Sequence, residues 1–100
     1  MNDFWLTPTA IRDLQEIWAS IAEEDLRAAD KLEADLLKAC GFLASQPGFG
    51  TERPLWTSLA VKFWVVKGHY FVMFATSTKP LEILRIIHPP RDLPELSGGD

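Results

Sequence analysis

The chain is poor in cysteine and has no long apolar run, and each shortage excludes a class of protein. Cys40 is the only cysteine among its 100 residues, so neither an intrachain disulfide nor a cysteine-based zinc site can form. This usage favours a reducing compartment, and we expect a cytoplasmic protein. The longest apolar stretches fall far short of the ~20 residues that cross a bilayer. The first residues also lack the apolar core of a signal peptide, so we expect no membrane association.

Positive charge is scarce as well. The net charge at pH 7 is −4 and the calculated isoelectric point is near 5.1, with most acidic residues in positions 1–50. Tight binding to nucleic acid depends on clustered lysine and arginine, which release counterions from the phosphates. An acidic chain gains little from this effect. We therefore expect no direct, sequence-specific binding of nucleic acid by the chain alone.

The length and composition predict one domain. With 47% apolar residues, one hundred residues are enough for a single modest core and too few for two. We assign this domain to residues 1–92. Residues 93–100 contain a proline and a Ser-Gly-Gly run, which is typical of a frayed C-terminal tail.

The first half of the chain has the period of helices. Phe4-Trp-Leu6 is typical of a short edge strand, and Thr7-Pro8 is a helix start, with a hydroxyl cap before proline in the first turn. Residues 8–24 and 26–45 then predict two helices that pack as an antiparallel hairpin. Apolar residues recur there at spacings of three and four: Ile11, Leu14, Ile17 and Ile21 in the first segment, and Ala29, Leu36, Cys40 and Leu43 in the second. Asp13, Glu16 and Ser20 fall on the polar face of the first helix.

The period changes to two in the second half of the chain. Residues 61–66, 70–76 and 81–88 are β-branched and aromatic runs of strand length, and their short connections make consecutive strands antiparallel. The result is an α+β domain of order β-α-α-β-β-β, with the helical hairpin packed on a mainly antiparallel sheet. Simple alternation in the last strand places two sets of side chains on opposite faces: Leu84, Ile86 and His88 on one, and Ile83, Arg85 and Ile87 on the other.

The last strand ends at a polar turn. His88 is followed by two prolines, which stop the ladder because they lack a backbone donor, and then by Arg91-Asp92. Polar side chains at the end of a packed strand have a rigid support, where binding sites are commonly built. His88 either acts as a base oriented by Asp92 or, more simply, hydrogen-bonds the turn. Arg91 either pairs with Asp92 or contacts a partner protein.

Arg85, Lys62 and Trp64 are further candidates for a binding surface. A charge inside an apolar strand needs a partner or solvent, so Arg85 either extends past its neighbours to water or contacts a partner. Lys62 and Trp64 share one face of their strand, where core packing is the simpler role for Trp64. Cys40 is expected to be inert, because a reactive cysteine needs an exposed, electropositive setting. No ligand motif indicates a metal site, and we expect no cofactor.

Several segments, taken in order, resemble the RelE/ParE superfamily of toxins from type II toxin–antitoxin systems. The similarity covers residues 4–92. Two segments resemble the family's opening and its Leu-x-x-x-Pro-x-x-Gly helix stop: Leu6-Thr-Pro-Thr-Ala-Ile-Arg-Asp-Leu14 and Leu43-Ala-Ser-Gln-Pro-Gly-Phe-Gly50. Three more are similar to its sheet strands and to the ParE-type His-x-x-Arg-Asp ending: Val61-Lys-Phe-Trp64, Tyr70-Phe-Val-Met-Phe74 and Ile83-Leu-Arg-Ile-Ile-His-Pro-Pro-Arg-Asp92.

The chain departs from the RelE branch at positions that matter for chemistry. RelE-type ribosome-dependent ribonucleases carry a basic residue in the middle sheet strand, lysines before it and a tyrosine near the C-terminus. Here Tyr70 occupies the mid-strand position, and no tyrosine or phenylalanine follows Arg91. Cleavage of RNA in that manner needs cations that stabilise the transition state. The resemblance therefore favours the ParE branch, whose members bind DNA gyrase and do not cleave nucleic acid.

The resemblance implies the toxin component of a type II toxin–antitoxin system. Such a protein causes growth arrest by binding a target such as DNA gyrase, and its cognate antitoxin neutralises it. No catalytic residue is expected. The residues assigned to target binding are His88, Arg91 and Leu93, and those assigned to antitoxin binding are Lys62, Trp64 and Arg85. The alternatives are a RelE-like ribosome-dependent mRNA endonuclease and an inactive toxin homologue.

Overall fold

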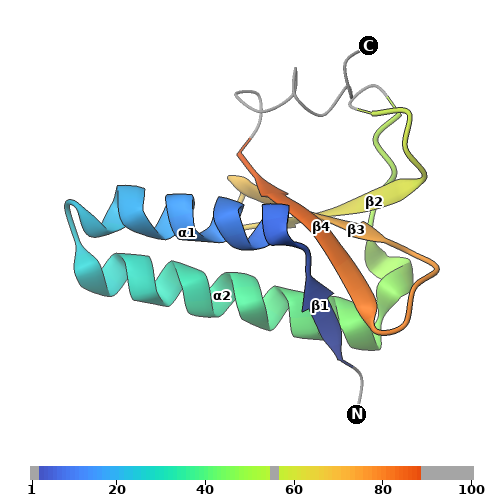
Figure 1. Ribbon diagram of the computed structural model, residues 1–100, viewed down its shortest axis with the longest axis horizontal. Helices are drawn as coiled ribbons and strands as arrows, with labels where there is room; N and C mark the ends of the chain where they lie inside the picture. Colours follow the sequence, from blue (N-terminus) through green and yellow to red (C-terminus); the bar gives the residue numbers. More distant parts are fainter. Residues whose placement is uncertain (1–2, 55–56, 89–100) are drawn as a thin grey trace.

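A computed structural model describes residues 3–54 and 57–88 of the chain. Two antiparallel helices lie on one side of a four-stranded sheet (Figure 1). The elements are β1 (Phe4–Leu6), α1 (Pro8–Ala22), α2 (Leu26–Ser45), the 3-10 turn η1 (Pro47–Phe49), β2 (Val61–Val66), β3 (Tyr70–Ala75) and β4 (Leu81–Ile87). The predicted α+β fold of order β-α-α-β-β-β is confirmed. No helix in the described ranges is long and apolar enough to span a bilayer.

The sheet has the strand order β1-β4-β3-β2. Strand β1 pairs with β4 in parallel, with Phe4 opposite Leu81, whereas the β4–β3 and β3–β2 pairs are antiparallel. The prediction of a mainly antiparallel sheet is therefore correct. The last strand in the sequence lies between the first and the third, so the two ends of the described chain meet within one sheet.

The turn between β2 and β3 is also tied to the helical layer. Lys67 and Gly68 both have positive φ, at 59° and 73°, as a type I′ hairpin turn requires. The Lys67 ammonium lies 3.1 Å from a carboxylate oxygen of Asp35 on α2. The hydrogen bond from Lys67 lowers the pKa of Asp35 below its usual value, with help from neighbouring lysines. This contact joins one end of the sheet to α2.

The main core lies between the helices and the sheet. The apolar stripe predicted for α2 is correct: Ala29, Leu32, Leu36, Cys40 and Leu43 are buried. The stripe predicted for α1 is partly wrong, because Ala10 is fully buried while Ile11 is 42% exposed. The backbone N–H of Thr7 donates to the Ile83 carbonyl and its hydroxyl donates to the Leu84 carbonyl. These long-range bonds tie the start of α1 to β4 and constrain the face that α1 turns inward.

A second apolar cluster covers the other face of the sheet. Its buried members are Val61, Phe63, Met73 and Ile87, with Phe71 and Leu84 packed against them. The predicted alternation in β4 is wrong, because Ile83 and Ile86 belong to the helix-facing core. Met73 pairs with Arg85 and Phe74 with Ile83, which leaves Leu84 as an extra residue. Such a bulge inverts the order of faces along the rest of the strand.

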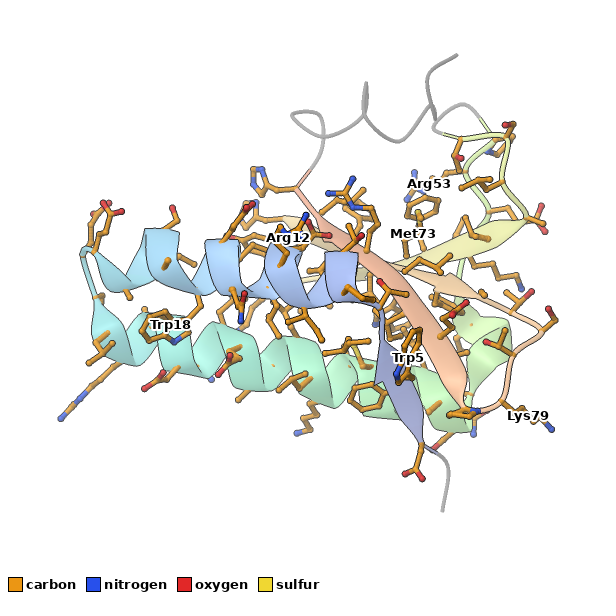
Figure 2. All side chains as sticks on the ribbon, in the orientation of Figure 1. Trp5, Arg12, Trp18, Arg53, Met73 and Lys79 are labelled. Atoms are coloured by element: carbon orange, nitrogen blue, oxygen red, sulfur yellow. The ribbon has the colours of Figure 1, made fainter. Side chains whose placement is uncertain are left out.

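Contacts outside the sheet complete both layers (Figure 2). Trp18 on α1 donates from its indole nitrogen to Asp30 on α2 at 2.8 Å, which fastens the hairpin near its tip. On the other side, Thr51 forms an antiparallel bridge with Phe63 of the edge strand β2. The guanidinium of Arg53 lies 5.4 Å from the centre of the Phe71 ring. The segment after η1 therefore contributes to the cover of the second face.

Cys40 should not react with thiol reagents in the native protein. It is fully buried in the core, and burial raises the pKa of its thiol to about 12, so almost no reactive thiolate is present near neutral pH. We expect negligible maleimide labelling of the folded chain at mildly alkaline pH and rapid labelling in denaturant. Mass spectrometry checks this, and equal labelling under both conditions would contradict the burial of Cys40.

Candidate functional site

The exposed edge of β4 beyond the short strand β1 is completed by α1. Strand β1 pairs only with residues 81–83 of β4, and backbone groups beyond that point need other partners. Thr7 supplies the first of them: its hydroxyl donates to the Leu84 carbonyl at 2.9 Å and accepts from the Ala10 N–H as the N-cap of α1. Pro8 follows in the first turn of α1. Its missing backbone N–H has no effect on the helix there, because the first N–H groups of a helix have no partner within it.

Asp13 supplies the second partner. One carboxylate oxygen accepts from the backbone N–H of Ile86 at 3.0 Å and from Nε of Arg85 at 3.0 Å. The other oxygen accepts from Arg85 Nη2 at 2.8 Å. The side chains of Asp13 and Arg85 are only 10% and 20% exposed. The polar face predicted for α1 is therefore wrong at Asp13, and Arg85 is not a cation extended into water, because each side chain neutralises the other.

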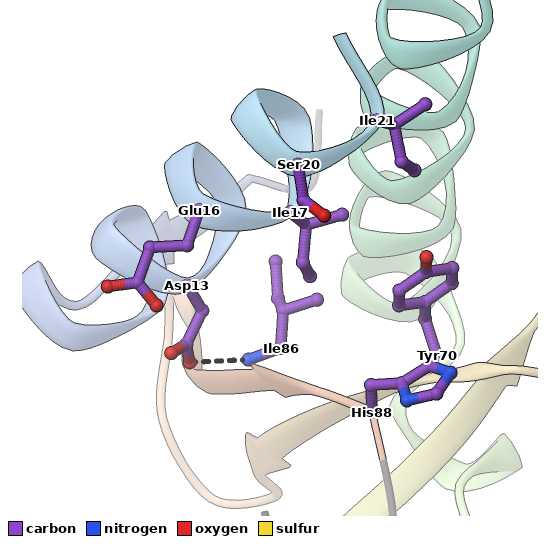
Figure 3. Close-up of a pocket in the computed structure, with 8 residues that line it drawn as sticks. All are labelled: Asp13, Glu16, Ile17, Ser20, Ile21, Tyr70, Ile86 and His88. Atoms are coloured by element: carbon purple, nitrogen blue, oxygen red, sulfur yellow. Dashed lines mark hydrogen bonds between the residues drawn. The ribbon is translucent and has the colours of Figure 1, made fainter. Parts of the chain in front are cut away.

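A pocket of about 180 Å³ opens beside this ion pair, between α1 and the ends of β3 and β4 (Figure 3). Helix α1 provides one wall and the sheet provides the other. The lining residues are Asp13, Glu16, Ile17, Ser20, Ile21, Tyr70, Ile86 and His88. Glu16 and Ser20 lie three and seven residues after Asp13, a spacing that places all three on one side of the helix. The pocket thus combines carboxylates and hydroxyls with an apolar base.

Three aromatic rings gather at the outer end of the pocket. The ring centres of Tyr70 and His88 are 5.2 Å apart, and His69 lies 6.3 Å from His88 in a stacked arrangement. Tyr70 begins β3 and His88 follows β4, and these strands are paired. Across residues 3–54 and 57–88, no three His, Cys, Asp or Glu side chains are grouped so that they could hold a metal ion.

A separate aromatic cluster lies at the edge strand β2. Trp64 packs against Phe42 of α2, with ring centres 5.5 Å apart, and against Phe49 of η1 at 6.3 Å. Phe49 is 55% exposed. Lys62 precedes Trp64 by two residues, and both pair with residues of the helix-facing core, Phe74 and Val72.

Comparison with known protein families identifies the relatives of this chain. Residues 5–93 match the model of the ParE toxin of the type II toxin–antitoxin system parDE. The chain belongs to the ParE toxin family. A search of curated protein sequences found no match to it.

A solved structure supports the ParE fold independently. The chain is similar to a protein of the chromosomal ParDE toxin–antitoxin system from P. aeruginosa, with a TM-score of 0.72 and 22% sequence identity. The match covers 88% of this chain and 96% of that one. At this identity the likeness concerns the fold alone. The match to the family model confirms the resemblance to the ParE branch that the sequence indicated.

The residues assigned to target binding fall only partly within the described ParE chain. His88 lies beside Tyr70 at the outer end of the pocket. Arg91 and Leu93 lie outside the described residues, as does Asp92, so the orientation of His88 by Asp92 stays a prediction. What the structure adds is that the strand leading to these residues ends at the pocket.

The residues assigned to antitoxin binding do not form one surface. Lys62 and Trp64 lie together on the helix-facing side of β2. Arg85 pairs with Met73, which belongs to the cluster on the opposite face, and its guanidinium binds Asp13. A role for Lys62 and Trp64 in one contact surface remains a prediction, as does a role for Arg85, whose guanidinium is bound to Asp13 of α1.

Sequence reasoning missed the acidic wall of the pocket. The sequence pattern predicts a solvated helix face for Asp13, Glu16 and Ser20, whose spacing places them together. The signal that would have distinguished them is Arg85, a cation inside an apolar strand, which required an acidic partner elsewhere in the chain. Asp13 is separated from Arg85 by 72 positions, so only the fold identifies it as that partner.

Proposed function

We propose that this ParE-family chain arrests growth by binding DNA gyrase, that it does not cleave nucleic acid, and that a cognate antitoxin neutralises it. The membership of the chain in the ParE family supports the toxin role. The finer assignment to gyrase rests on the resemblance to the ParE branch and on the character of the pocket at the strand ends. The protein acts by occupying a surface of its target.

The observation that carries this proposal is the chemistry of the pocket. Its described lining contains no lysine or arginine, and Glu16 is its uncompensated carboxylate, since Arg85 neutralises Asp13. Phosphodiester cleavage without a metal depends on cations that stabilise the charge developing on phosphorus. Carboxylates beside a phosphate act in the opposite direction, because they repel it. This composition favours a protein-binding site over a ribonuclease site.

The test is an assay of purified protein on gyrase and on translated mRNA. We expect inhibition of gyrase-catalysed DNA supercoiling and no cuts in mRNA on translating ribosomes. Site-specific mRNA fragments without an effect on gyrase would establish the ribonuclease alternative. Loss of growth arrest upon co-expression of the product of the neighbouring reading frame would identify that product as the antitoxin.

Arg91 should be required for growth arrest. It follows β4, His88 and two prolines in the sequence, and arginine is enriched among residues that dominate protein interfaces. We expect Arg91→Ala to abolish arrest in a plating assay while circular dichroism and the melting temperature stay unchanged. Arg27→Ala is the control, since Arg27 is exposed on α2 and does not line the pocket. Arrest that survives Arg91→Ala would place the target-binding surface elsewhere.

A further inference from the structure

Three polar groups in the pocket are not used by the fold. The carboxylate of Glu16, the hydroxyl of Ser20 and the hydroxyl of Tyr70 line the pocket, and they have no hydrogen bond or ion pair with any part of the chain that the structure describes. Asp13 differs, because its oxygens are bound by Arg85 and by the Ile86 N–H. In Figure 3 the Tyr70 hydroxyl points toward α1, across the pocket. The free groups are thus acceptors that a ligand can reach.

The remaining surface of the pocket is apolar or aromatic. Ile17, Ile21 and Ile86 line it together with the rings of Tyr70 and His88. Its volume of about 180 Å³ far exceeds the ~10–15 Å³ that one water molecule needs. An aliphatic chain packs favourably on such isoleucines while its polar end reaches the acceptors. The pocket therefore fits a long side chain that has an apolar stem and a donor group.

The charge of the pocket specifies the donor. Arg85 neutralises Asp13, so Glu16 is the uncompensated charge of the lining, and His88 is its one basic group among the described residues. A cation gains from Glu16 and from the face of the Tyr70 ring. Arginine should bind in this pocket more strongly than lysine, because its planar guanidinium presents five donors in fixed directions and stacks on aromatic rings. An anion would be repelled by the carboxylate of Glu16.

We propose that the pocket lined by Glu16, Ser20, Tyr70 and His88 binds an arginine side chain presented by a protein partner. The proposal rests on the proposed function in one respect, namely that the chain acts by binding proteins. The guanidinium donates to Glu16 and to the hydroxyls of Ser20 and Tyr70, and the methylene stem packs on Ile17, Ile21 and Ile86. This assigns a specific role to the polar side of α1.

The direct test is a titration of the isotope-labelled protein with N-acetyl-arginine amide, followed by NMR. We expect saturable shifts of the Ile86, Tyr70 and His88 signals. N-acetyl-citrulline amide is the matched probe, since it keeps the shape and removes the charge. It should bind about tenfold more weakly, because a charge-assisted hydrogen bond is lost. Equal binding of the two probes, or no saturation with either, would overturn the proposal.

Glu16→Gln tests the same pocket from the protein side. The substitution keeps the length of the side chain and removes its charge. It should lower the affinity for the arginine probe about tenfold. Glu24→Gln is the control, because it removes an equal charge from an exposed position beyond the end of α1. Identical loss in both variants would indicate a general charge effect and refute the pocket.

The two proposals can fail separately. The titration contains no gyrase, so an inactive protein in the supercoiling assay can still bind the arginine probe. Conversely, a protein that inhibits gyrase but does not bind the arginine probe would refute the arginine pocket and leave the proposed function standing. Phosphate is a useful third probe. Saturable shifts of the same signals by inorganic phosphate would indicate an anion site centred on His88 and overturn the proposal.

Discussion

Replacement of Asp13 by asparagine is expected to lower the free energy of unfolding by about 3 kcal/mol, because removal of one partner from a buried ion pair is strongly destabilising. Arg85 would keep its charge in a setting where only 20% of its side chain is exposed. The Ile86 N–H would also lose a charged acceptor. For a domain of this size the melting temperature should fall by more than ~10 °C.

Urea denaturation and thermal melts of the unchanged protein and three variants provide the measurement. Asp35→Asn is the matched control, because Asp35 also pairs with a basic side chain, Lys67, but at a more exposed position. This control should lower the free energy of unfolding by much less than Asp13→Asn does, because the pair is more exposed to solvent. A double variant, Asp13→Asn with Arg85→Met, should recover part of the loss, since the cation that has lost this carboxylate is then absent. An Asp13→Asn protein as stable as Asp35→Asn would refute the structural role of the pair.

Replacement of Gly50 by alanine is the second change with a large expected effect. A Cβ atom at this position would lie 2.7 Å from Cβ of Lys62 and would overlap the ring of Phe74. Phe74 is fully buried in the core, so the ring cannot turn away into solvent. Such overpacking typically costs 1–3 kcal/mol, and we expect about 2 kcal/mol in urea denaturation.

Gly48→Ala separates this packing effect from a general effect of losing glycine. Gly48 lies two residues earlier, and a Cβ atom there would meet nothing within 4 Å. Alanine at this position should leave stability unchanged or raise it slightly, because it restricts the unfolded chain. If both alanine variants lose stability equally, the close approach of Gly50 to Phe74 is not the reason that glycine stands there.

The order of elements was predictable from the sequence because its signals are local. The Thr7-Pro8 cap, the helical spacing of the apolar residues and the change to a period of two all act within a few residues. The same holds for the short connections between the strands, one of which is the turn at Lys67 and Gly68. Local rules of this kind gave helix and strand bounds close to those observed.

Features that depend on pairing between distant segments were not predictable. The bulge at Leu84 arises from the register between β3 and β4, so alternation along β4 alone gave the wrong faces. In the sequence, Asp13 and Arg85 can each be interpreted as solvent-facing. Only the packing of α1 on β4 shows that they bind each other. Gly50 was identified within a segment that resembles a helix stop, yet its backbone has φ −67°, and the close approach of Phe74 is what excludes a side chain.

The central position of β4 affects how this protein is made. Because β4 lies between β1 and β3, a nascent chain that has not yet reached Leu81 has no strand to join its N-terminal segment to the rest of the sheet. The helices are then synthesised before the surface that their apolar faces cover. Contacts between residues so far apart in sequence form slowly, and the incomplete chain exposes apolar side chains that invite aggregation or chaperone binding. A chain terminated early in translation therefore lacks the completed fold, and with it the pocket that Ile86 and His88 help to form.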